Sequence, residues 1–414
     1  MTKQRVVVTG LGCLTPIGCN KDDFWKSLLE GKSGAKTIDF LDVDKLPVKF
    51  SASVKDFQSD KYFDKKDLKK MDLFMQYGMA AGIDAVADAK LLESQCNPDR
   101  IGVSIGSGIG GLYNIENTRD TFIKSGSRRI SPFFVPASII NMISGNLSIK
   151  YGFKGPNLSI VTACTTGTHN IGEGFRQIQY SHADVMICGG AEMATSDLGV
   201  GGFAAARALS TRNDSPETAS RPWDKDRDGF VLGDGAGVIV LEELEHAKKR
   251  GAKIYAEIKG YGMSADAYHM TLPSETGEGA SRCMTLALED ANLDPSNIDY
   301  INAHGTSTPA GDILELKAVK KTFGSHSKNL VINSTKSMIG HLLGAAGGVE
   351  AIVCILSILN GKIHQTINIE NLDQECDLNV NHESSIDCDI NFALSNSFGF
   401  GGTNGSLIFS KFKD

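Results

Sequence analysis

The chain has 414 residues, with 42 Lys and Arg against 49 Asp and Glu, a formal net charge of −7, and 41% hydrophobic and 22% charged residues. This composition excludes a disordered chain, and the acidic balance argues against wholesale binding of nucleic acid or of an anionic membrane, which both need a basic surface. The 45 glycines exceed the average for this length, so we expect them in turns and at close backbone approaches.

Short runs rich in β-branched residues alternate along the chain with longer amphipathic stretches, which is the pattern of an α/β protein. We expect strands at residues 5–9, 101–105, 158–161, 185–188, 237–241, 254–261, 299–303, 331–333, 389–394 and 405–409. We expect helices at residues 21–31, 70–89, 166–180, 279–291, 312–323 and 347–360. Because no linker-like segment interrupts this alternation, one body is expected.

An internal repeat runs through the sequence. The segment VVVTGLGCLTPIG near the start resembles IYAEIKGYGMSAD, VTACTTGTHNIGEG resembles INSTKSMIGHLLGAAGG, and VLGDGAGVIVLEE resembles SFGFGGTNGSLIFSK. Each match alone is weak, but the three occur in the same order. They predict two similar halves, at residues 1–250 and 251–414.

The sequence contains no recognisable export or membrane segment. The start, MTKQRVVVTG, has no apolar core of a signal peptide, and the most apolar stretch, Ala351 to Leu359, is shorter than the roughly 20 residues that cross a bilayer. The nine cysteines are scattered, and several lie in apolar runs, as buried thiols do in a reducing compartment. We therefore expect a cytoplasmic protein with no membrane contact.

Cys164 stands where a predicted strand turns into a predicted helix. A hydrophobic run ends at Val161, and Ile171 and Ile178 follow on one helical face. A cysteine at the start of a helix meets the positive end of the helix dipole and free backbone N–H groups, which lower the pKa of a thiol. A buried structural thiol is the alternative, but the small residues around Cys164 leave its sulfur open to a substrate. Cys164 is the candidate nucleophile.

Two histidines and a lysine lie, like Cys164, in loops next to predicted strands or helices. His304 follows the predicted strand at 299–303, and His341 opens a helix of the second half. Lys336 has approximately the place in the second half that Cys164 has in the first. An isolated histidine in a glycine-rich loop is often a scaffold residue, and Lys336 can equally be a solvated surface lysine. Because loops at the carboxyl ends of strands carry the sites of α/β proteins, the three residues and Cys164 form a candidate constellation.

Two other motifs do not fit their context. The run GSGIGG from Gly106 matches a dinucleotide-binding fingerprint, but no second strand ending in Asp or Glu follows, and residues 116–134 read as polar and broken. Ser104 in GVSIG lies within a strand, whereas a serine nucleophile needs a sharp turn into a helix. No cluster with zinc-like spacing occurs.

Four segments together resemble the β-ketoacyl-[acyl carrier protein] synthases: VTACTTGTHNIG, NAHGTSTPAGD, NSTKSMIGHLLGAAGG and NSFGFGGTNGSLIF. The GSGIGG loop with GGFAAARALSTRND is similar to the elongating type, synthase II. The resemblance runs from Val6 to Phe409. It implies an α/β, thiolase-like fold whose duplicated halves form a five-layered αβαβα body, usually a homodimer, which agrees with the internal repeat.

The resemblance also implies a reaction and its residues. Cys164 takes an acyl chain from a carrier-protein thioester, malonyl carrier protein loses CO₂, and the resulting carbanion attacks the acyl-cysteine. His304 and His341 match the two active-site histidines of the family. The backbone N–H groups of Cys164 and Phe400 match its oxyanion hole. Lys336 matches its active-site lysine, which is expected to pair with Glu350.

Further residues match binding positions of the family. Ile109, Phe203 and Phe400 match the acyl pocket, and Thr271, Thr306 and Thr308 match contacts of the phosphopantetheine arm. Acyl carrier protein, which is strongly acidic, is the implied partner, so a local basic patch must attract it to a chain of net charge −7. The candidates for this patch are Lys65, Lys66, Lys69, Lys70, Arg128, Arg129 and Arg207. A solvated helix face is the alternative for the lysine run.

Several alternatives stay open. Within the fold they are a thiolase or an initiating synthase with a Cys-His-Asn site, a synthase I, a polyketide-type synthase, and an inactive partner subunit, which lacks the cysteine. A Cys-His hydrolase would release a free acid instead of forming a carbon–carbon bond. We expect no cofactor besides the phosphopantetheine of the carrier protein and no catalytic metal. The sequence leaves open whether a structural cation binds near Asn302, Glu350 and Asn396.

Overall fold

The strands of the computed structural model, which describes residues 3–413, form a ten-stranded sheet in the order β10-β9-β13-β14-β8-β1-β7-β6-β4-β5. The first half supplies β1 (Val6–Leu14), β4 (Ile101–Gly106), β5 (Asn157–Leu158), β6 (Val185–Glu192) and β7 (Gly235–Glu243). The second half supplies β8 (Ala256–Ala265), β9 (Tyr300–Asn302), β10 (Val331–Asn333), β13 (Phe392–Gly399) and β14 (Thr403–Ser410). Two short pairs lie outside this sheet, β2 (Lys36–Thr37) with β3 (Phe50–Ser51) and β11 (Lys362–Ile363) with β12 (Ile386–Asp387).

The two halves have the same topology. In the first, β1 and β6 are antiparallel to β7, and β4 is parallel to β6 and β5. In the second, β8 and β13 are antiparallel to β14, and β9 is parallel to β13 and β10. The halves are joined where Val6, Val7 and Val8 of β1 pair with β8. The duplication expected from the internal repeat is therefore present, while the exact boundary at residue 250 stays a prediction.

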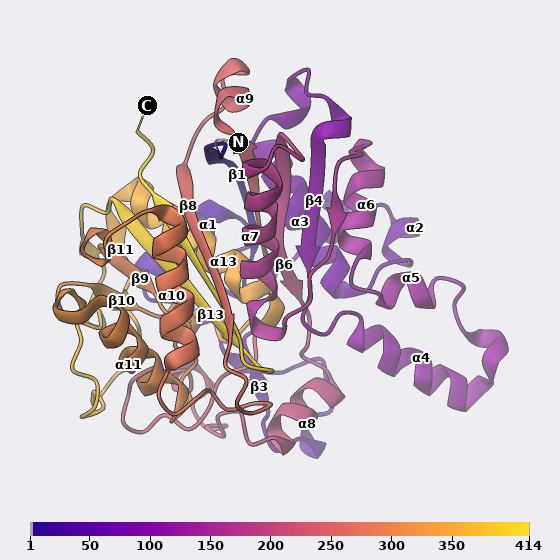
Figure 1. The fold of residues 1–414 in the computed structure, drawn as a ribbon. Coiled ribbons are helices and arrows are strands. Elements are labelled where there is room, and N and C mark those ends of the chain that lie inside the picture. The colour runs from indigo at the N-terminus through magenta and orange to yellow at the C-terminus, as the bar shows by residue number, and fades with distance from the viewer. Residues whose placement is uncertain (1–2, 414) are drawn as a thin grey trace.

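The helices make the remaining layers (Figure 1). They are α1 (Lys21–Leu29), α2 (Lys65–Leu68), α3 (Leu73–Asp88), α4 (Leu112–Ser125), α5 (Phe134–Ser138), α6 (Met142–Tyr151), α7 (Thr166–Gln179), α8 (Asp197–Ala205), α9 (Leu244–Lys249), α10 (Glu278–Ala291), α11 (Gly311–Phe323), α12 (Lys336–Ile339) and α13 (Ala346–Asn360). Helices α7 and α13 lie between the two halves of the sheet, α3 and α6 cover the outer face of the first half, and α10 and α11 cover that of the second. This is the αβαβα arrangement expected from the sequence.

Glycines allow the central helices to approach each other and the sheet. A Cβ on Gly167 of α7 would lie 2.6 Å from the backbone nitrogen of Gly348 in α13. A Cβ on Gly237 of β7 would lie 2.3 Å from the backbone nitrogen of Val349. Since real Cβ atoms do not come this close, these glycines set the spacing of the central layer. Part of the glycine excess is thus used for close backbone approach, as expected.

Helix α13 and the turn before it form the most apolar stretch of the described chain. The 18 residues Leu343–Asn360 have a mean hydropathy of 1.8. Among the described residues, this is the one helical stretch that is long enough and apolar enough to cross a membrane. The sequence-based estimate of nine residues, Ala351 to Leu359, was therefore too short. However, 89% of the stretch is buried inside the protein, where it packs against both halves of the sheet. It is the central core helix.

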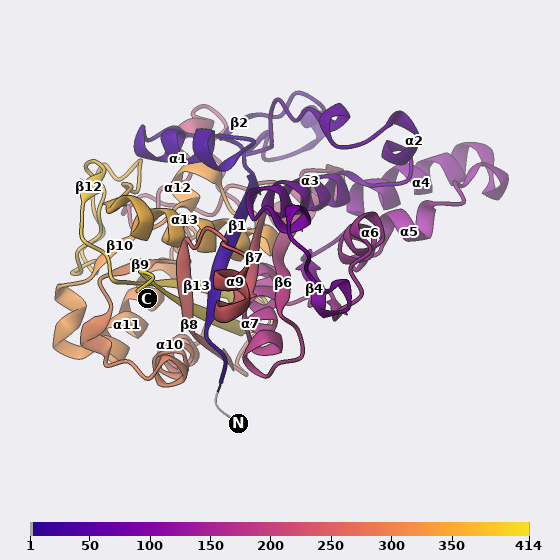
Figure 2. The same ribbon diagram turned by 90° about the horizontal axis from the view of Figure 1, so that it is seen from above.

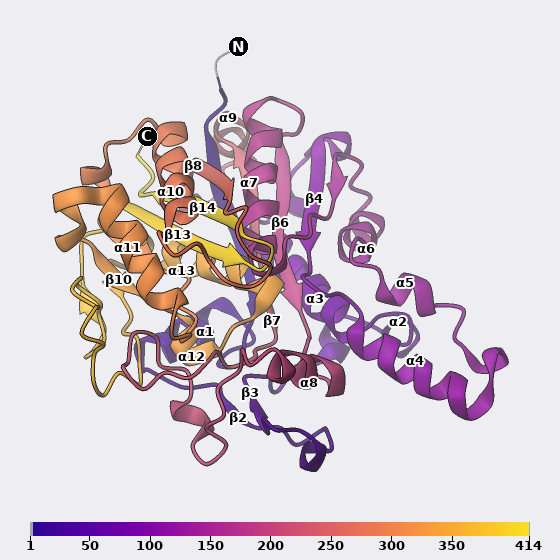
Figure 3. The ribbon, with the colours of Figure 1, turned by 60° about the horizontal axis from the view of Figure 1, so that its bottom comes forward.

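The region between β4 and β5 differs most from the expectation. The sequence of residues 116–134 is polar and shows no continuous helix or strand pattern. In the structure, however, α4 is a helix of 14 residues that contains no buried residue. Its apolar side chains Ile115, Phe122 and Ile123 are separated by the polar run of residues 116–121, so no continuous apolar stripe marked the helix in the sequence. With α5 it projects from the body as an arm (Figures 2 and 3). The strand expected at 158–161 is also shorter, because β5 ends at Leu158.

Candidate active site

Cys164 lies in a strained turn at the start of α7. The turn is a single 3₁₀ turn, Ala163–Thr165, and Ala163 has a φ of +50°. The second half repeats it: Leu343 has a φ of +46° at the start of the turn Leu343–Ala345, which leads into α13. A left-handed backbone at a non-glycine residue costs energy and is typical of functional sites. The repeat makes Gly344 the counterpart of Cys164, so the approximate match with Lys336 was wrong.

The second half of the molecule holds this turn in place. The Thr165 hydroxyl donates to the Thr403 carbonyl at 3.0 Å, and the Thr403 hydroxyl donates to the Thr162 carbonyl at 3.1 Å. Thr162 Oγ1 also shares a hydrogen bond of 2.8 Å with Nδ1 of His169. The conformation around Cys164 is therefore fixed by residues far away in the sequence.

The Cys164 sulfur is buried and receives two backbone amides. Burial raises the pKa of its thiol to about 11, while the N–H groups of Phe400 and of Cys164 itself, together with the Lys336 ammonium, act to lower it. Phe400 reaches this position through the turn between β13 and β14, where Gly401 and Gly402 have φ values of +85° and +71°. The lowered pKa expected from the helix start was wrong, because desolvation outweighs the amides. The resting thiol is protonated at neutral pH.

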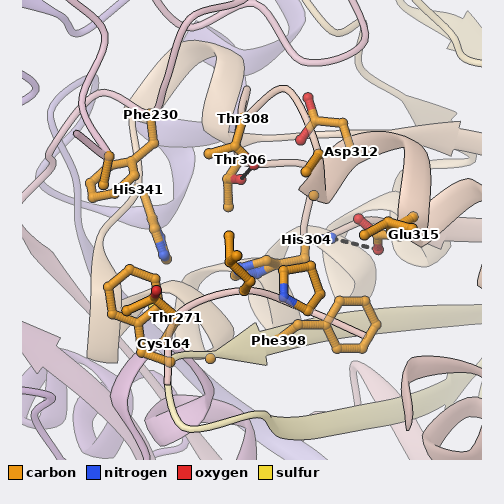
Figure 4. A pocket seen from close by; sticks show the side chains of 18 of the residues that line it. Cys164, Phe230, Thr271, His304, Thr306, Thr308, Asp312, Glu315, His341 and Phe398 are labelled. Atoms are coloured by element: carbon orange, nitrogen blue, oxygen red, sulfur yellow. Dashed lines mark hydrogen bonds between the residues drawn. The ribbon is translucent and has the colours of Figure 1, made fainter. Parts of the chain in front are cut away.

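His304 and His341 lie beside each other, opposite Cys164 (Figure 4). Their ring centroids are 5.2 Å apart with the planes nearly perpendicular, and Phe230 and Phe398 pack against the rings. Burial and the Lys336 ammonium hold the pKa of both histidines well below the usual value. Both rings are therefore neutral at pH 7, and each offers one donor and one acceptor nitrogen.

Backbone hydrogen bonds fix both histidines. The carboxylate of Glu315, on α11, accepts the N–H of His304 at 2.9 Å and that of Gly305 at 2.8 Å. The His341 N–H donates to the Val231 carbonyl at 2.7 Å. Within residues 3–413, neither His304 Nδ1 nor His341 Nδ1 has a hydrogen-bond partner. The rings are held by their backbones and by packing, and because both Nδ1 atoms are buried, a substrate can be contacted only through the Nε2 atoms.

Lys336 and Glu350 form a buried ion pair, as expected. The Lys336 ammonium donates to Oε1 of Glu350, and both side chains are at most 1% exposed. Burial raises the pKa of Glu350 to about 7, although Lys336 opposes this shift. Lys336 does not line the cavity that contains the histidines. It acts on them through its charge, which favours the neutral imidazoles.

Buried oxygen atoms without partners occur on Glu350 itself and on two residues of neighbouring strands. Among the described residues, Oδ1 of Asn302, Oε2 of Glu350 and Oγ of Ser395 are buried without a hydrogen-bond partner. Hard oxygen donors of this kind suit a cation. Oδ1 of Asn396, which the sequence also suggested, accepts the Ser406 hydroxyl at 2.7 Å. Among the described residues, no group of three or more His, Cys, Asp or Glu is placed to hold a metal ion.

A cavity of about 360 Å³ connects Cys164, His304 and His341 to the surface. The predicted residues Thr271, Thr306, Thr308, Phe203, Phe400 and Arg207 all line it. Ile109 does not; its side chain is 38% exposed in this single chain, so the structure does not bring it to a closed pocket floor.

The other predicted basic residues lie away from the cavity. Lys65, Lys66 and Lys69 are exposed on and after α2, and Arg128 and Arg129 are exposed at the end of α4. The Lys70 ammonium contacts Asp67 at 2.7 Å and lies 5.8 Å from the centre of the Phe133 ring.

Comparison with known proteins agrees with this geometry. Residues 3–247 match the family model "Beta-ketoacyl synthase, N-terminal domain", and residues 255–370 match "Beta-ketoacyl synthase, C-terminal domain". The chain belongs to the beta-ketoacyl synthase family. It is 55% identical over 412 residues to 3-oxoacyl-[acyl-carrier-protein] synthase 2 of Vibrio harveyi, covering 99% of both chains. The same-named protein of Coxiella burnetii is 55% identical over 414 residues, covering 100% of both.

Solved structures support the same family and fold. A beta-ketoacyl synthase from Burkholderia phymatum has a TM-score of 0.92 and 36% identity, covering 99% of this chain and 100% of its own. A ketosynthase of a type II polyketide synthase, solved in complex with its acyl-carrier protein, has a TM-score of 0.92 and 32% identity over 99% of this chain and 100% of its own. The thiolase-like fold expected from the sequence is confirmed.

The sequence did not reveal two carboxylates of this beta-ketoacyl synthase. Glu315 holds the backbone of His304, and Glu192, at the end of β6, contacts the loop after β4 and the start of α13. Glu192 lies 83 residues after Ile109, whereas Glu315 lies 11 residues after His304, on the helix that follows the His304 loop. An acidic residue at the end of a buried apolar strand, as Glu192 is, was the one available signal, because buried carboxylates need partners.

Proposed function

We propose that this chain joins the acyl group of an acyl-[acyl carrier protein] to malonyl-[acyl carrier protein], giving 3-oxoacyl-[acyl carrier protein] and CO₂ in fatty acid chain elongation. The observation that carries the proposal is the cavity in which Cys164, with two amides on its sulfur, faces His304 and His341. The 55% identity to 3-oxoacyl-[acyl-carrier-protein] synthase 2 over the full length supports it.

The first step transfers the acyl group to Cys164. Because its thiol has a pKa of about 11, the proton must leave as the sulfur attacks the thioester carbonyl. The proton is passed on to the sulfur of the departing carrier, so neither His304 nor His341 has to take it up. The oxyanion receives the N–H groups of Cys164 and Phe400. When this tetrahedral intermediate breaks down, the carbon–sulfur bond to the carrier breaks. The carrier leaves as a thiolate that takes up the proton, and the acyl group stays on Cys164.

The second step forms the carbon–carbon bond. Neutral His304 and His341 can each donate an N–H to the thioester oxygen of malonyl carrier protein, which stabilises the enolate as the carboxylate leaves as CO₂. The enolate carbon attacks the acyl-cysteine carbonyl, and the same two amides stabilise the second oxyanion. Collapse releases the Cys164 thiolate, which takes up one proton. In this scheme the enzyme uses only its own residues, and both substrates are carried on the phosphopantetheine of the carrier protein.

The alternatives fit less well. A Cys-His-Asn site has one histidine, whereas two histidines face Cys164 here. The ketosynthase of the type II polyketide synthase is 32% identical, well below the 55% identity to 3-oxoacyl-[acyl-carrier-protein] synthase 2 of Vibrio harveyi. A hydrolase would have to direct a water molecule to the acyl-cysteine carbonyl. The two neutral histidines suit the stabilisation of an enolate oxygen instead.

An acidic carrier protein is the proposed partner, and contacts connect the basic residues to the cavity mouth. Asp72, close to the lysines of α2, accepts the N–H of Asn114 in α4 at 2.7 Å. Glu116 of the same helix accepts the Ser196 hydroxyl at the start of α8 at 2.7 Å. Arg207 follows α8 and lines the cavity. These elements form one side of the molecule (Figure 3), along which a carrier protein can be attracted.

We also propose a homodimer, located in the cytoplasm. Strand β5 is the last strand of the sheet, and large apolar side chains are exposed on it, on α6 and on the arm. They are Ile115, Phe122, Ile123, Phe133, Val135, Ile139, Ile149 and Leu158. Such a patch favours the binding of a second copy of the chain, and sedimentation as a monomer at micromolar concentration would contradict this.

The proposed location in the cytoplasm rests on the cysteines. All nine cysteines, which lie in the described chain, are free, in agreement with a reducing compartment.

Product analysis tests the proposal. The chain is incubated with acyl carrier protein loaded with a saturated acyl group and with malonyl carrier protein labelled in its free carboxyl. We expect labelled CO₂ and a 3-oxoacyl carrier protein in equal amounts. Free fatty acid without a 3-oxoacyl product would indicate a hydrolase instead.

A further inference from the structure

His169 is a buried histidine that the proposed mechanism does not use. It lies in α7, five residues after Cys164, and is 7% exposed. Its Nδ1 shares a hydrogen bond of 2.8 Å with Oγ1 of Thr162, and its Nε2 lies 3.2 Å from the carbonyl oxygen of Asn404. Burial of a polar side chain is favourable only when its polar atoms are paired, and both ring nitrogens of His169 are paired.

The two partners fix the tautomer of the His169 ring. The Asn404 carbonyl can only accept a hydrogen bond, so Nε2 carries a proton and donates it. Burial holds the pKa of His169 below its usual value, so the ring is neutral at pH 7 and its Nδ1 is an acceptor. The Thr162 hydroxyl therefore donates to Nδ1. The neutral ring makes one directed hydrogen bond on each side.

These partners belong to the two segments that form the oxyanion hole. Thr162 directly precedes the 3₁₀ turn that carries Cys164. Asn404 is the second residue of β14, which begins after the turn that carries Phe400. Helix α7 packs against β14 (Figure 3), so His169 can span both segments. One ring thus connects the chain next to the first amide of the hole with the chain next to the second.

The His169 ring is packed closely between these segments. A Cβ on Gly405 of β14 would lie 3.2 Å from Cδ2 of His169 and 2.8 Å from Cγ2 of Thr165. The ring of Tyr261, in β8, lies against the imidazole with the centroids 6.1 Å apart and the planes at 69°. Because a side chain confined in this way cannot shift freely, it keeps the two segments at a set distance.

The second half of the molecule provides an internal comparison. The turn in front of α13 matches the turn in front of α7 residue by residue, so the counterpart of His169 is Val349. Val349 is fully buried, and a Cβ on Gly237 of β7 would lie 2.3 Å from its backbone nitrogen. An apolar side chain therefore satisfies the packing at this position. Of the two equivalent positions, the one beside Cys164 has the bridging histidine.

We propose that His169 is a positioning residue that keeps the N–H groups of Cys164 and Phe400 aimed at one oxyanion, by bridging the loop before the nucleophile to the strand after Phe400. An oxyanion hole is effective because its donors are in place before the charge develops, so a displaced amide weakens it. The inference rests on the proposed function, because it needs a thioester substrate. It assigns to His169 the alignment of the donors and no transfer of a proton.

The test compares two reactions of Cys164, of which one forms an oxyanion. Acylation by acyl carrier protein adds the sulfur to a carbonyl carbon and passes through the oxyanion. Alkylation by iodoacetamide forms a sulfur–carbon bond as iodide leaves and the thiol proton passes to solvent, so it does not need the hole. Both rates are measured by mass spectrometry on the peptide that contains Cys164, and the ratio of acylation to alkylation is the readout.

Three variants of His169 grade the loss of the bridge. His169→Val introduces the side chain found in the second half and removes both hydrogen bonds. We expect it to lower the ratio about tenfold to a hundredfold, which is less than the loss of a whole oxyanion donor costs. His169→Asn keeps an acceptor for Thr162, and His169→Gln keeps a donor for Asn404, so each should lower the ratio by less than His169→Val.

Ile171→Ala is the matched control. Ile171 lies in the same helix and is fully buried in the core, but its side chain has no polar atom that could bridge the two segments. This variant should lose thermal stability and keep the wild-type ratio. If His169→Val does not fold, His169→Asn and His169→Gln carry the test, because each lacks one of the two hydrogen bonds.

An unchanged ratio in the His169 variants, or an equal fall of the ratio in Ile171→Ala, would overturn the role of His169 and leave it as a packing residue. The proposed function itself would fail in a different way. In that case iodoacetamide would alkylate Cys164 of the wild type, but acyl carrier protein would not acylate it.

Discussion

The buried pair of Lys336 and Glu350 allows the electrostatic role of the lysine to be separated from its structural one. Both side chains are at most 1% exposed, so Lys336→Met leaves an unpaired buried carboxylate. Removing one partner of such a pair costs about 3–5 kcal/mol, and Glu350→Gln, which strands the ammonium, should cost a similar amount. The double variant leaves no charge behind. Its free energy of unfolding should therefore be reduced by much less than the sum of the two single effects.

The activity of the same variants should not follow their stability. The Lys336 ammonium lowers the pKa of His304 and of His341, so its removal raises both pKa values toward the usual one. A raised pKa protonates the imidazoles at higher pH, and the acid limb of the decarboxylation rate against pH should move upward. This movement should occur in Lys336→Met and persist in the double variant, because both lack the ammonium.

Urea denaturation and the pH dependence of CO₂ release measure these two effects. A double variant with restored stability and a still shifted pH profile is the expected result. If the double variant regained the wild-type pH profile together with its stability, the charge of Lys336 would not act on the histidines, and the pair would only support the fold.

Three further predictions concern other parts of the molecule. His304→Ala and His341→Ala should each abolish CO₂ release while intact mass still detects the acyl-cysteine; loss of acylation in both variants would contradict their assignment to the second step. Charge reversal at Lys65 and Lys69 should raise the KM for acyl carrier protein and weaken the salt dependence of that KM. Turnover of a small pantetheine thioester should not change, and an equal effect on both substrates would mean that the lysines support structure only. Gly167→Ala should lower the free energy of unfolding by about 1–3 kcal/mol, because the new Cβ would lie 2.6 Å from the backbone of α13; unchanged urea denaturation would disprove the close packing.

The layers of the fold were predictable where burial creates a pattern. Strands such as β7, expected at residues 237–241 and found at Gly235–Glu243, contain apolar runs because both faces are covered. Helix α13 was likewise found within one residue of its expected start. In contrast, α4 was missed because it contains no buried residue and because the polar run of residues 116–121 separates its apolar side chains. Patterns reveal burial, and an exposed arm gives no such signal.

The candidate site was predictable in its residues but not in its electrostatics. Cys164, His304 and His341 were identified from their loops, and the structure brings them into one cavity. The direction of the Cys164 pKa was wrong, because the loss of water around a sulfur depends on segments that are distant in sequence. Glu192 was missed for the same reason, since its partners are on distant segments.

The central claim is that Cys164 carries the acyl group, and peptide mapping after acylation tests it most directly. The wild type and Cys164→Ala are incubated with acyl carrier protein alone, digested, and analysed by mass spectrometry. The account predicts one acyl group per wild-type chain, on the peptide that contains Cys164, its removal on addition of malonyl carrier protein, and no acyl group on the variant. Acylation of Cys164→Ala at the wild-type rate, or an acyl group on another residue that malonyl carrier protein removes, would contradict the account.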